Sequence, residues 1–356
     1  MFALGAIVSL CYVPGLTGAF IATQWPVLSI LLPFSLWRSG PVTIFHWLGL
    51  LFIAYGAARL SYTPIFNDGI FSLWPFCILG LSFWLGSTLN DLRGLYAGLA
   101  VGASVSSVLA VFQAFGYQGV PYVSISPAGI YANGVAQGIV LSLIVVALVS
   151  ERMWLWVPLL LPGIVLCGSR GAWLALAVGL ISTYVRSAWV LVIVVLAGLF
   201  FSSQISASDE LRLLIWRTAA SHLTWLGWGP GAFFSWLIEY QGTPIYPEYA
   251  HNDALQLAAE YGIAAALPIG IFAFLLTRTA EREWPVIVTF AAASCYSMPL
   301  WVPTASFLVF VAAGRIVRGW AVAWDCGDNR RFDFVPREHR RRSAPSGDVV
   351  PVFAGN

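Results

Sequence analysis

The stretch 128–150, AGIYANGVAQGIVLSLIVVALVS, contains no charged side chain. About 20 consecutive apolar residues are enough for a helix to cross the hydrocarbon core of a bilayer. Similar runs recur along the chain, in which 59% of the 356 residues are hydrophobic and only 10% are charged. Since a soluble domain carries roughly 25% charged residues, the sequence predicts an all-α, polytopic membrane protein.

Apolar run length predicts about twelve transmembrane helices. Two segments fall outside this pattern, a long loop at 204–250 and a polar tail at 321–356. We expect residues 1–320 to form one transmembrane domain that includes the loop, and the arginine-rich tail to be disordered. The predicted spans are 3–22, 24–37, 42–60, 69–87, 93–115, 128–150, 153–168, 171–185, 187–203, 254–277, 284–300 and 302–319.

The arginines predict how these spans are oriented, because the chain contains no lysine. If the N-terminus is cytoplasmic, fourteen of the 18 arginines fall on the cytoplasmic side. This distribution agrees with the positive-inside rule. It places the tail in the cytoplasm and the long loop at the periplasmic or exterior face. The arginines left on the outer side are Arg59, Arg170, Arg212 and Arg217.

Three of these outer arginines lie in unusual surroundings, whereas Arg59 ends a span and is interpreted as a snorkelling side chain. Arg170 stands in CGSRGAWLAL, in a tight turn between two short spans, with Gly168 and Gly171 beside it. Glycine permits close approach of a backbone or a ligand. Arg170 is therefore either a snorkelling side chain in a helical hairpin or an anion-binding cation at the membrane surface.

The long loop begins with a predicted helix that carries Arg212 and Arg217 on neighbouring but different faces. GWGPGAF, from Gly227 to Phe233, then ends this helix with three glycines and a proline, which is typical of a turn. Most of the aromatic side chains that follow fit an interfacial belt. We expect one or two of them to be available for stacking against sugar rings.

The stretch YAHNDALQLAAEYGI, Tyr249 to Ile263, concentrates polar residues in an otherwise apolar chain. Its spacing predicts a helix with Asp253 as N-cap and Gln256 as its capping-box partner. Asp253, Gln256 and Glu260 then share one side of the helix, which would explain them by structure alone. His251 precedes the helix N-terminus, where the dipole disfavours imidazolium. A neutral histidine there is a candidate general base, although a lone histidine is more often structural.

These motifs, in this order, resemble the O-antigen ligase and polymerase superfamily of bacterial membrane glycosyltransferases. The resemblance rests on SRGAWLAL, on R-x-x-x-W-R leading to GWGPGAF, and on HND-x-LQL-x-AEYG, and with the topology it covers roughly residues 1–320. It implies a GT-C-like catalytic domain in the bacterial inner membrane. Such enzymes transfer a glycan from a polyprenyl-pyrophosphate carrier to a hydroxyl acceptor at the periplasmic face.

The resemblance also implies roles for individual residues. Arg170 and Arg217 would bind the donor pyrophosphate with support from Arg212, and His251 would help to deprotonate the acceptor. Asn252 and Asp253, which follow in the motif, join the substrate-binding set. The ligase pattern H-N-x9-G-x-x-[G/T/Y] is met at His251, Asn252 and Gly262 but fails at Ala265. The acceptor is therefore lipid A core for a ligase, or a growing glycan for a repeat-unit polymerase.

Pyrophosphate is a good leaving group, and arginine forks can neutralise the negative charge that develops on it. Direct attack on the anomeric carbon would invert its configuration, because no covalent intermediate is required. A catalytic metal would need convergent carboxylates, whereas the predicted outer loops offer only Asp68 and the adjacent Asp209 and Glu210. We therefore expect transfer without metal or cofactor.

Membrane lipids are expected partners, and nucleic acid is not. A transporter or flippase is the alternative outside the enzymes. Such proteins place ionisable groups near the bilayer midplane and often contain repeats. The predicted spans carry almost no charge at their centres and no repeat is evident, so a transferase is favoured.

Overall fold

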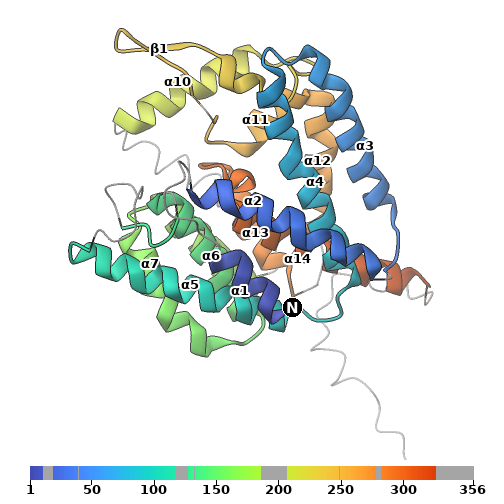
Figure 1. Cartoon of the computed structure of the whole chain (residues 1–356), viewed down its shortest axis with the longest axis vertical. Coiled ribbons are helices and arrows are strands. Elements are labelled where there is room, and N and C mark those ends of the chain that lie inside the picture. The colour runs from blue at the N-terminus through green and yellow to red at the C-terminus, as the bar shows by residue number, and fades with distance from the viewer. Residues whose placement is uncertain are drawn as a thin grey trace, which may run out of the picture.

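The computed structural model of the chain describes residues 1–10, 19–38, 40–117, 127–131, 133–185, 207–247, 249–277 and 282–325. It is mostly helical, at 76%, which agrees with the predicted all-α class (Figure 1). The helices are α1 Phe2–Leu10, α2 Ala19–Leu31, η1 Leu32–Trp37, α3 Ile44–Arg59, η2 Leu60–Tyr62, α4 Phe66–Thr88, α5 Arg93–Ala114, α6 Gly134–Ser150, η3 Trp154–Trp156, α7 Val157–Leu166, α8 Arg170–Tyr184, α10 Ala207–Ser221, η4 Ala232–Ser235, α11 Asp253–Tyr261, α12 Ile263–Thr277, α13 Trp284–Ser294, η5 Pro299–Trp301 and α14 Pro303–Asp325.

Within the described residues, three helical stretches are long and apolar enough to cross a membrane. They are Ile44–Tyr62, Phe66–Thr88 and Arg93–Ala114, and shorter apolar helices accompany them at Gly134–Ser150, Trp154–Leu166, Ile263–Phe272 and Trp284–Ser294. The structure thus contains membrane-compatible helices, and the figure of twelve spans stays a prediction. The predicted span 187–203 and most of the predicted tail lie outside the described residues.

Two of the predicted span boundaries are wrong. The expected break between 3–22 and 24–37 falls inside the continuous helix α2. Gln24 lies there fully buried, and both ends of its amide are paired. Its Nε2 donates to Val8 O at 2.8 Å and its Oε1 accepts from Thr304 Oγ1 at 2.8 Å. The predicted span 254–277 is instead interrupted at Gly262, which has a φ of 85° and separates α11 from α12.

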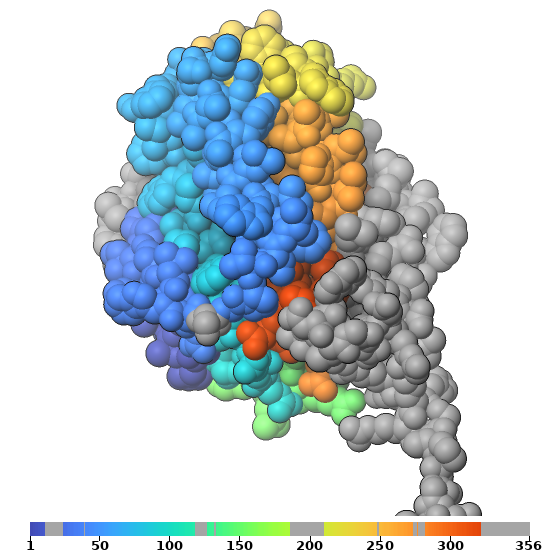
Figure 2. Space-filling model, turned by 90° about the vertical axis from the view of Figure 1, so that its right-hand side faces the viewer, coloured from blue at the N-terminus to red at the C-terminus, as the bar shows by residue number. Residues whose placement is uncertain are grey.

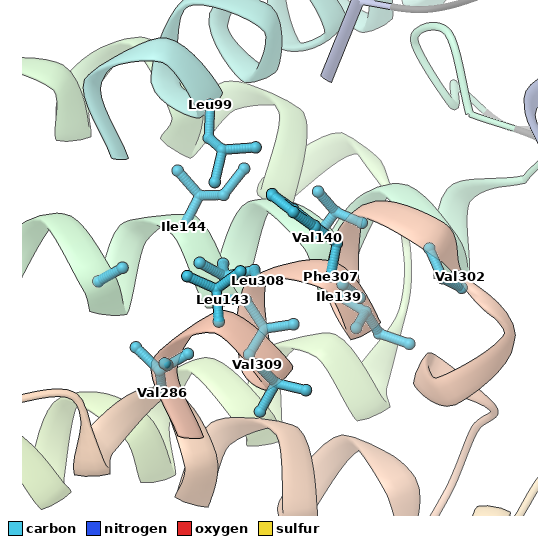
Figure 3. Close-up of a cluster of buried hydrophobic side chains, with 14 of the residues drawn as sticks. Leu99, Ile139, Val140, Leu143, Ile144, Val286, Val302, Phe307, Leu308 and Val309 are labelled. Atoms are coloured by element: carbon cyan, nitrogen blue, oxygen red, sulfur yellow. The ribbon is translucent and has the colours of Figure 1, made fainter. Parts of the chain in front are cut away.

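The helix that contains most of the stretch 128–150 lies in the centre of the apolar core. All residues of α6 from Gly134 to Val149, apart from Val135, are buried, as expected for a helix that is apolar on every side. Figure 3 shows Ile144 of α6 next to Leu99 of α5, and Leu143 of α6 next to Leu308 of α14.

Close contact between α4 and α14 depends on glycine. A Cβ atom on Gly86 would collide with the backbone of Val311, and one on Gly314 would collide with the backbone of Phe83. Small residues let helix backbones approach closely, and this is a common means of helix association within membranes.

Several arginines gather at one end of the molecule, which we call the arginine end. Arg93 Nε and Arg282 Nη1 lie 3.3 and 3.6 Å from the carboxylate of Glu151. Arg315 and Arg318 donate to Asn90 in the turn that joins α4 to α5, and Arg318 also donates to Ser87 O in the last turn of α4. All four arginines belong to the set predicted for the cytoplasmic side.

The segment 207–247 covers the opposite end, which we call the loop end. In Figure 2 this segment (yellow) lies above α3 and α4 (blue) and α12 (orange). Tyr55 Oη donates to Leu226 O and Arg59 Nη2 donates to Gly227 O, each at 2.6 Å. Arg59 therefore clamps the loop to α3, a structural role that its interpretation as a snorkelling side chain did not include.

The segment 207–247 contains a helix and a small hairpin. The predicted helix around Arg212 is present as α10, and the predicted turn at GWGPGAF is present as well. Strands β1 Ile238–Tyr240 and β2 Thr243–Ile245 pair antiparallel, with Ile238 opposite Ile245. Their turn, Gln241 and Gly242, has positive φ at both residues, as a type I′ turn requires.

Candidate functional site

The residues that precede α11, 249–252, form a short connector that we call the His251 segment. Asn252 has an extended φ of −156°, and its Oδ1 accepts the N–H of Leu255 at 2.9 Å. Asn252 is thus the N-cap of α11. The predicted capping box of Asp253 and Gln256 is wrong, because Asp253 is already the first helical residue and its carboxylate turns toward another element.

Asn252 and Asp253 fasten the start of α11 to the region that follows α13. Asn252 Nδ2 donates to Cys295 O at 3.2 Å. Ser294 Oγ and the N–H of Leu300 each donate to Asp253 Oδ2 at 3.0 Å. These bonds join the Asp253 carboxylate to the region that follows α13. Because Asp253 is only 4% exposed, its carboxylate offers little surface to a ligand.

Helix α10 packs against the His251 segment through one face. Arg212, Ile215 and Trp216 share that face, since residues three and four apart in a helix lie on the same side. Ile215 is buried, and Trp216 Nε1 donates to Ala250 O at 2.8 Å. The same face brings the charge of Arg212 close enough to affect His251.

His251 has an environment that keeps its imidazole neutral. Burial, followed by the nearby charge of Arg212, lowers the pKa of His251 to about 4. At pH 7 the ring therefore has a nitrogen lone pair that can accept a proton. The backbone of His251 has a φ of 52°, in the left-handed region that non-glycine residues rarely adopt.

Arg170 lies at the start of α8 and is linked to the His251 segment by a short path. Ser169 is the N-cap of α8 and accepts the N–H of Ala172 at 3.2 Å. A Cβ atom on Gly171 would lie 3.7 Å from Cβ of Tyr296. Tyr296 follows Cys295, the residue whose carbonyl binds Asn252. The start of α8, where Arg170 lies, is thus next to the residue that follows the partner of Asn252.

Arg217 is placed differently from the other predicted site residues. It lies five residues after Arg212, which corresponds to a rotation of roughly 140° around a helix with 3.6 residues per turn. Its side chain is exposed, whereas Arg212 and His251 are half-buried. In the described part of the chain, Arg217 is therefore not brought to His251 with Arg212.

The end of α11 supports the glycine-rich turn of the loop. The N–H groups of Trp228 and Gly229 donate to Ala259 O and Glu260 O, at 3.1 and 2.8 Å. Glu260 Oε2 accepts from Ser72 Oγ of α4 and from the N–H of Gly231, both at 3.1 Å. The spacing of the residues predicted Glu260 on the same side of α11 as Asp253 and Gln256. The bonds of Glu260 to the turn and to Ser72 were not predicted.

No group of three histidine, cysteine, aspartate or glutamate side chains suitable for a metal ion occurs among the described residues. The charge of Arg212 acts on a neutral His251, and a cation near a neutral imidazole is suited to an anionic ligand beside a proton acceptor.

A scan against models of known protein families finds no match to this chain, and a search of curated proteins finds none either.

Proposed function

We propose that this protein is a glycosyltransferase of the bacterial inner membrane. It transfers a glycan from polyprenyl pyrophosphate to a hydroxyl of lipid A core at the periplasmic face. The observation that carries the proposal is the placement of neutral His251 beside Arg212, with Arg170 on an adjoining element. A cation for the leaving group and a base for the nucleophile are the two groups that this reaction needs.

The proposed step forms one bond and breaks one bond. The acceptor oxygen attacks the anomeric carbon, and the bond from that carbon to the pyrophosphate oxygen breaks with inversion. The proton of the acceptor hydroxyl goes to His251. The released pyrophosphate stays on its lipid carrier, where Arg170 and Arg212 neutralise its charge through bidentate hydrogen bonds.

The low pKa of His251 in the free protein is compatible with its role as a base. Burial, the larger cause of the low pKa, would remain when a donor is bound, but an anionic donor near Arg212 would offset the charge of that arginine and raise the pKa of His251. The base would then become stronger when the donor is present. We assign Asn252 and Asp253 to positioning, since their described hydrogen bonds are made within the protein.

A repeat-unit polymerase of the same superfamily is the second candidate. Ala265, which departs from the ligase pattern, lies in the first turn of α12, where its N–H donates to Gly262 O at 3.2 Å. It is half-exposed beside the loop end. The transfer chemistry proposed for Arg212 and His251 does not depend on Ala265, so the same chemistry would serve a growing glycan.

The test is transfer by the purified protein in lipid vesicles that contain a polyprenyl-pyrophosphate glycan, with or without lipid A core. Product that forms only with lipid A core supports the ligase, and a ladder of lengthening glycan without it supports the polymerase.

We expect Arg170→Ala and His251→Ala each to abolish transfer, and EDTA to leave it unchanged. Arg38→Ala, outside the loop end, and His222→Ala, stacked on Trp236 at 4.4 Å, are the matched controls. Wild-type rates in Arg170→Ala or His251→Ala would remove that residue from the mechanism.

A further inference from the structure

A chain of buried hydrogen bonds runs through α11 from its last turn to the backbone before His251. The N–H of Ala250 donates to Gln256 Oε1 at 3.0 Å, and Gln256 Nε2 donates to Glu260 Oε1 at 3.2 Å. Glu260 Oε2 receives Ser72 Oγ and the N–H of Gly231 at its far end. Ala250, Gln256 and Glu260 are each at most 1% exposed.

This chain fixes the backbone that leads into His251. The N–H of Ala250 is held by Gln256, and its carbonyl oxygen is held by Trp216 Nε1 of α10 at 2.8 Å. That carbonyl belongs to the peptide unit that ends at the nitrogen of His251. A left-handed non-glycine residue persists only where its surroundings determine its conformation, and these two bonds supply that constraint at His251.

We infer that Gln256 and Glu260 are positioning residues that hold His251 in its working orientation through the peptide groups of Ala250. That this orientation is the catalytic one rests on the proposed function. The physical link from Glu260 to His251 can be tested without any transfer reaction.

The direction of the hydrogen bonds makes the inference specific. Glu260 must accept on both oxygens, so Gln256 must offer its amide hydrogens to Glu260 and its oxygen to Ala250. A glutamine at position 260 has one acceptor oxygen. If that oxygen faces Ser72 and Gly231, the amide of Gln256 must turn and the N–H of Ala250 loses its acceptor. If the oxygen faces Gln256, the N–H of Gly231 loses its acceptor instead.

Exchanging the two side chains restores the bonds to Ala250, Ser72 and Gly231 and the bond between positions 256 and 260. In the double variant Gln256→Glu with Glu260→Gln, the glutamate at 256 accepts from Ala250 and from the new amide at 260. The oxygen of that amide accepts from Ser72 and Gly231. The size, composition and net charge of the pair are unchanged, and only its direction along the helix is reversed.

The experiment compares wild type, Glu260→Gln and the exchanged double variant in lipid vesicles. We expect Glu260→Gln to lower kcat about 10²-fold, the scale of effect for a misplaced catalytic group, with KM for the donor within about threefold. The double variant should recover to within about fivefold of wild type. Gln256→Ala should act like Glu260→Gln. Gln113→Ala is its matched control, since Gln113 Oε1 also accepts backbone N–H groups, those of Ala128 and Gly129.

A second measurement follows His251 directly. The rate at which diethyl pyrocarbonate modifies His251, relative to His222 in the same peptide map, should change in Glu260→Gln and return in the double variant. If the wild type shows no transfer but this pattern holds, the proposed function fails and the link to His251 stands. Unchanged modification and kcat in Glu260→Gln overturn the inference. So does a folded double variant that recovers neither quantity.

Discussion

At the scale of single residues, the site depends on the neutrality of His251. Its pKa is lowered to about 4, first by burial and then by Arg212. The folded protein thus binds fewer protons at His251 than the unfolded chain, whose histidine has a pKa near 6.5. The contribution of the neutral ring to stability is complete above about pH 6.5 and is lost as pH falls toward 4.

The same pKa predicts how transfer depends on pH. Because kcat/KM reports the free enzyme, its acid limb should have a midpoint near pH 4 and not near 6.5. Arg212→Gln removes a positive charge that opposes protonation, so the midpoint should move to higher pH. Arg217→Gln, on another face of the same helix, should leave the midpoint in place. Initial rates between about pH 3.5 and 8 measure this. A midpoint that is unaltered by Arg212→Gln would show that Arg212 does not act on His251.

Sequence patterns predicted the helix and the buried side of α11, but they placed its N-cap one residue too late. Both Asn252 and Asp253 are good N-cap residues, so local propensity does not choose between them. Contacts distant in sequence make the choice, because Ser294 and Leu300 bind the Asp253 carboxylate. Ser72, 188 residues before Glu260, was likewise beyond the reach of local patterns.

At the scale of elements, the break between α11 and α12 brings the site and the loop together. Gly262 allows α11 to stay at the loop end, where both of its ends contact the segment 207–247. After the break, α12 runs toward the arginine end, and Phe272 packs on Phe45 near the start of α3 with ring centroids 4.8 Å apart. The apolar run 254–277 looks continuous in sequence because the loop that forces the break lies elsewhere in the chain.

Gly262→Ala should therefore destabilise the protein. The residue has a φ of 85° and a ψ of 161°, a conformation essentially restricted to glycine. A Cβ atom would also lie 2.6 Å from the nitrogen of Gly227 and would collide with Trp225 O. We expect a loss of at least about 1–3 kcal/mol, seen as a lower Tm in detergent. Gly270→Ala is the matched control, because nothing lies within 4 Å of its added Cβ, and it should be neutral or slightly stabilising. Equal Tm values for both variants would contradict this account.

At the scale of the whole molecule, successive helices connect two chemically different ends. Helices α4 and α14 run in the same direction, from the loop end to the arginine end. Phe76 lies against Trp301, just before α14, with ring centroids 6.0 Å apart, and Arg318 Nη1 donates to Ser87 O at the arginine end, whereas Gly69 lies near Pro230 at the loop end. The charge pattern of the sequence predicted this division, since it depends only on where arginines fall between apolar runs. It could not predict the hairpin of β1 and β2 or the placement of α10, which depend on packing at the loop end.

The division between the two ends predicts which end faces the periplasm. Since arginines are retained on the cytoplasmic side, the loop end should be periplasmic. In a variant whose five cysteines are replaced by alanine, we would introduce Ser221→Cys at the loop end or Asp91→Cys at the arginine end, both at exposed positions. A membrane-impermeant maleimide should label position 221 in intact spheroplasts and position 91 only after permeabilisation. Both must label in detergent, which controls for reactivity. The reverse pattern would place Arg212 and His251 in the cytoplasm, away from any periplasmic acceptor, and the proposed reaction would have to be abandoned even if both residues proved essential.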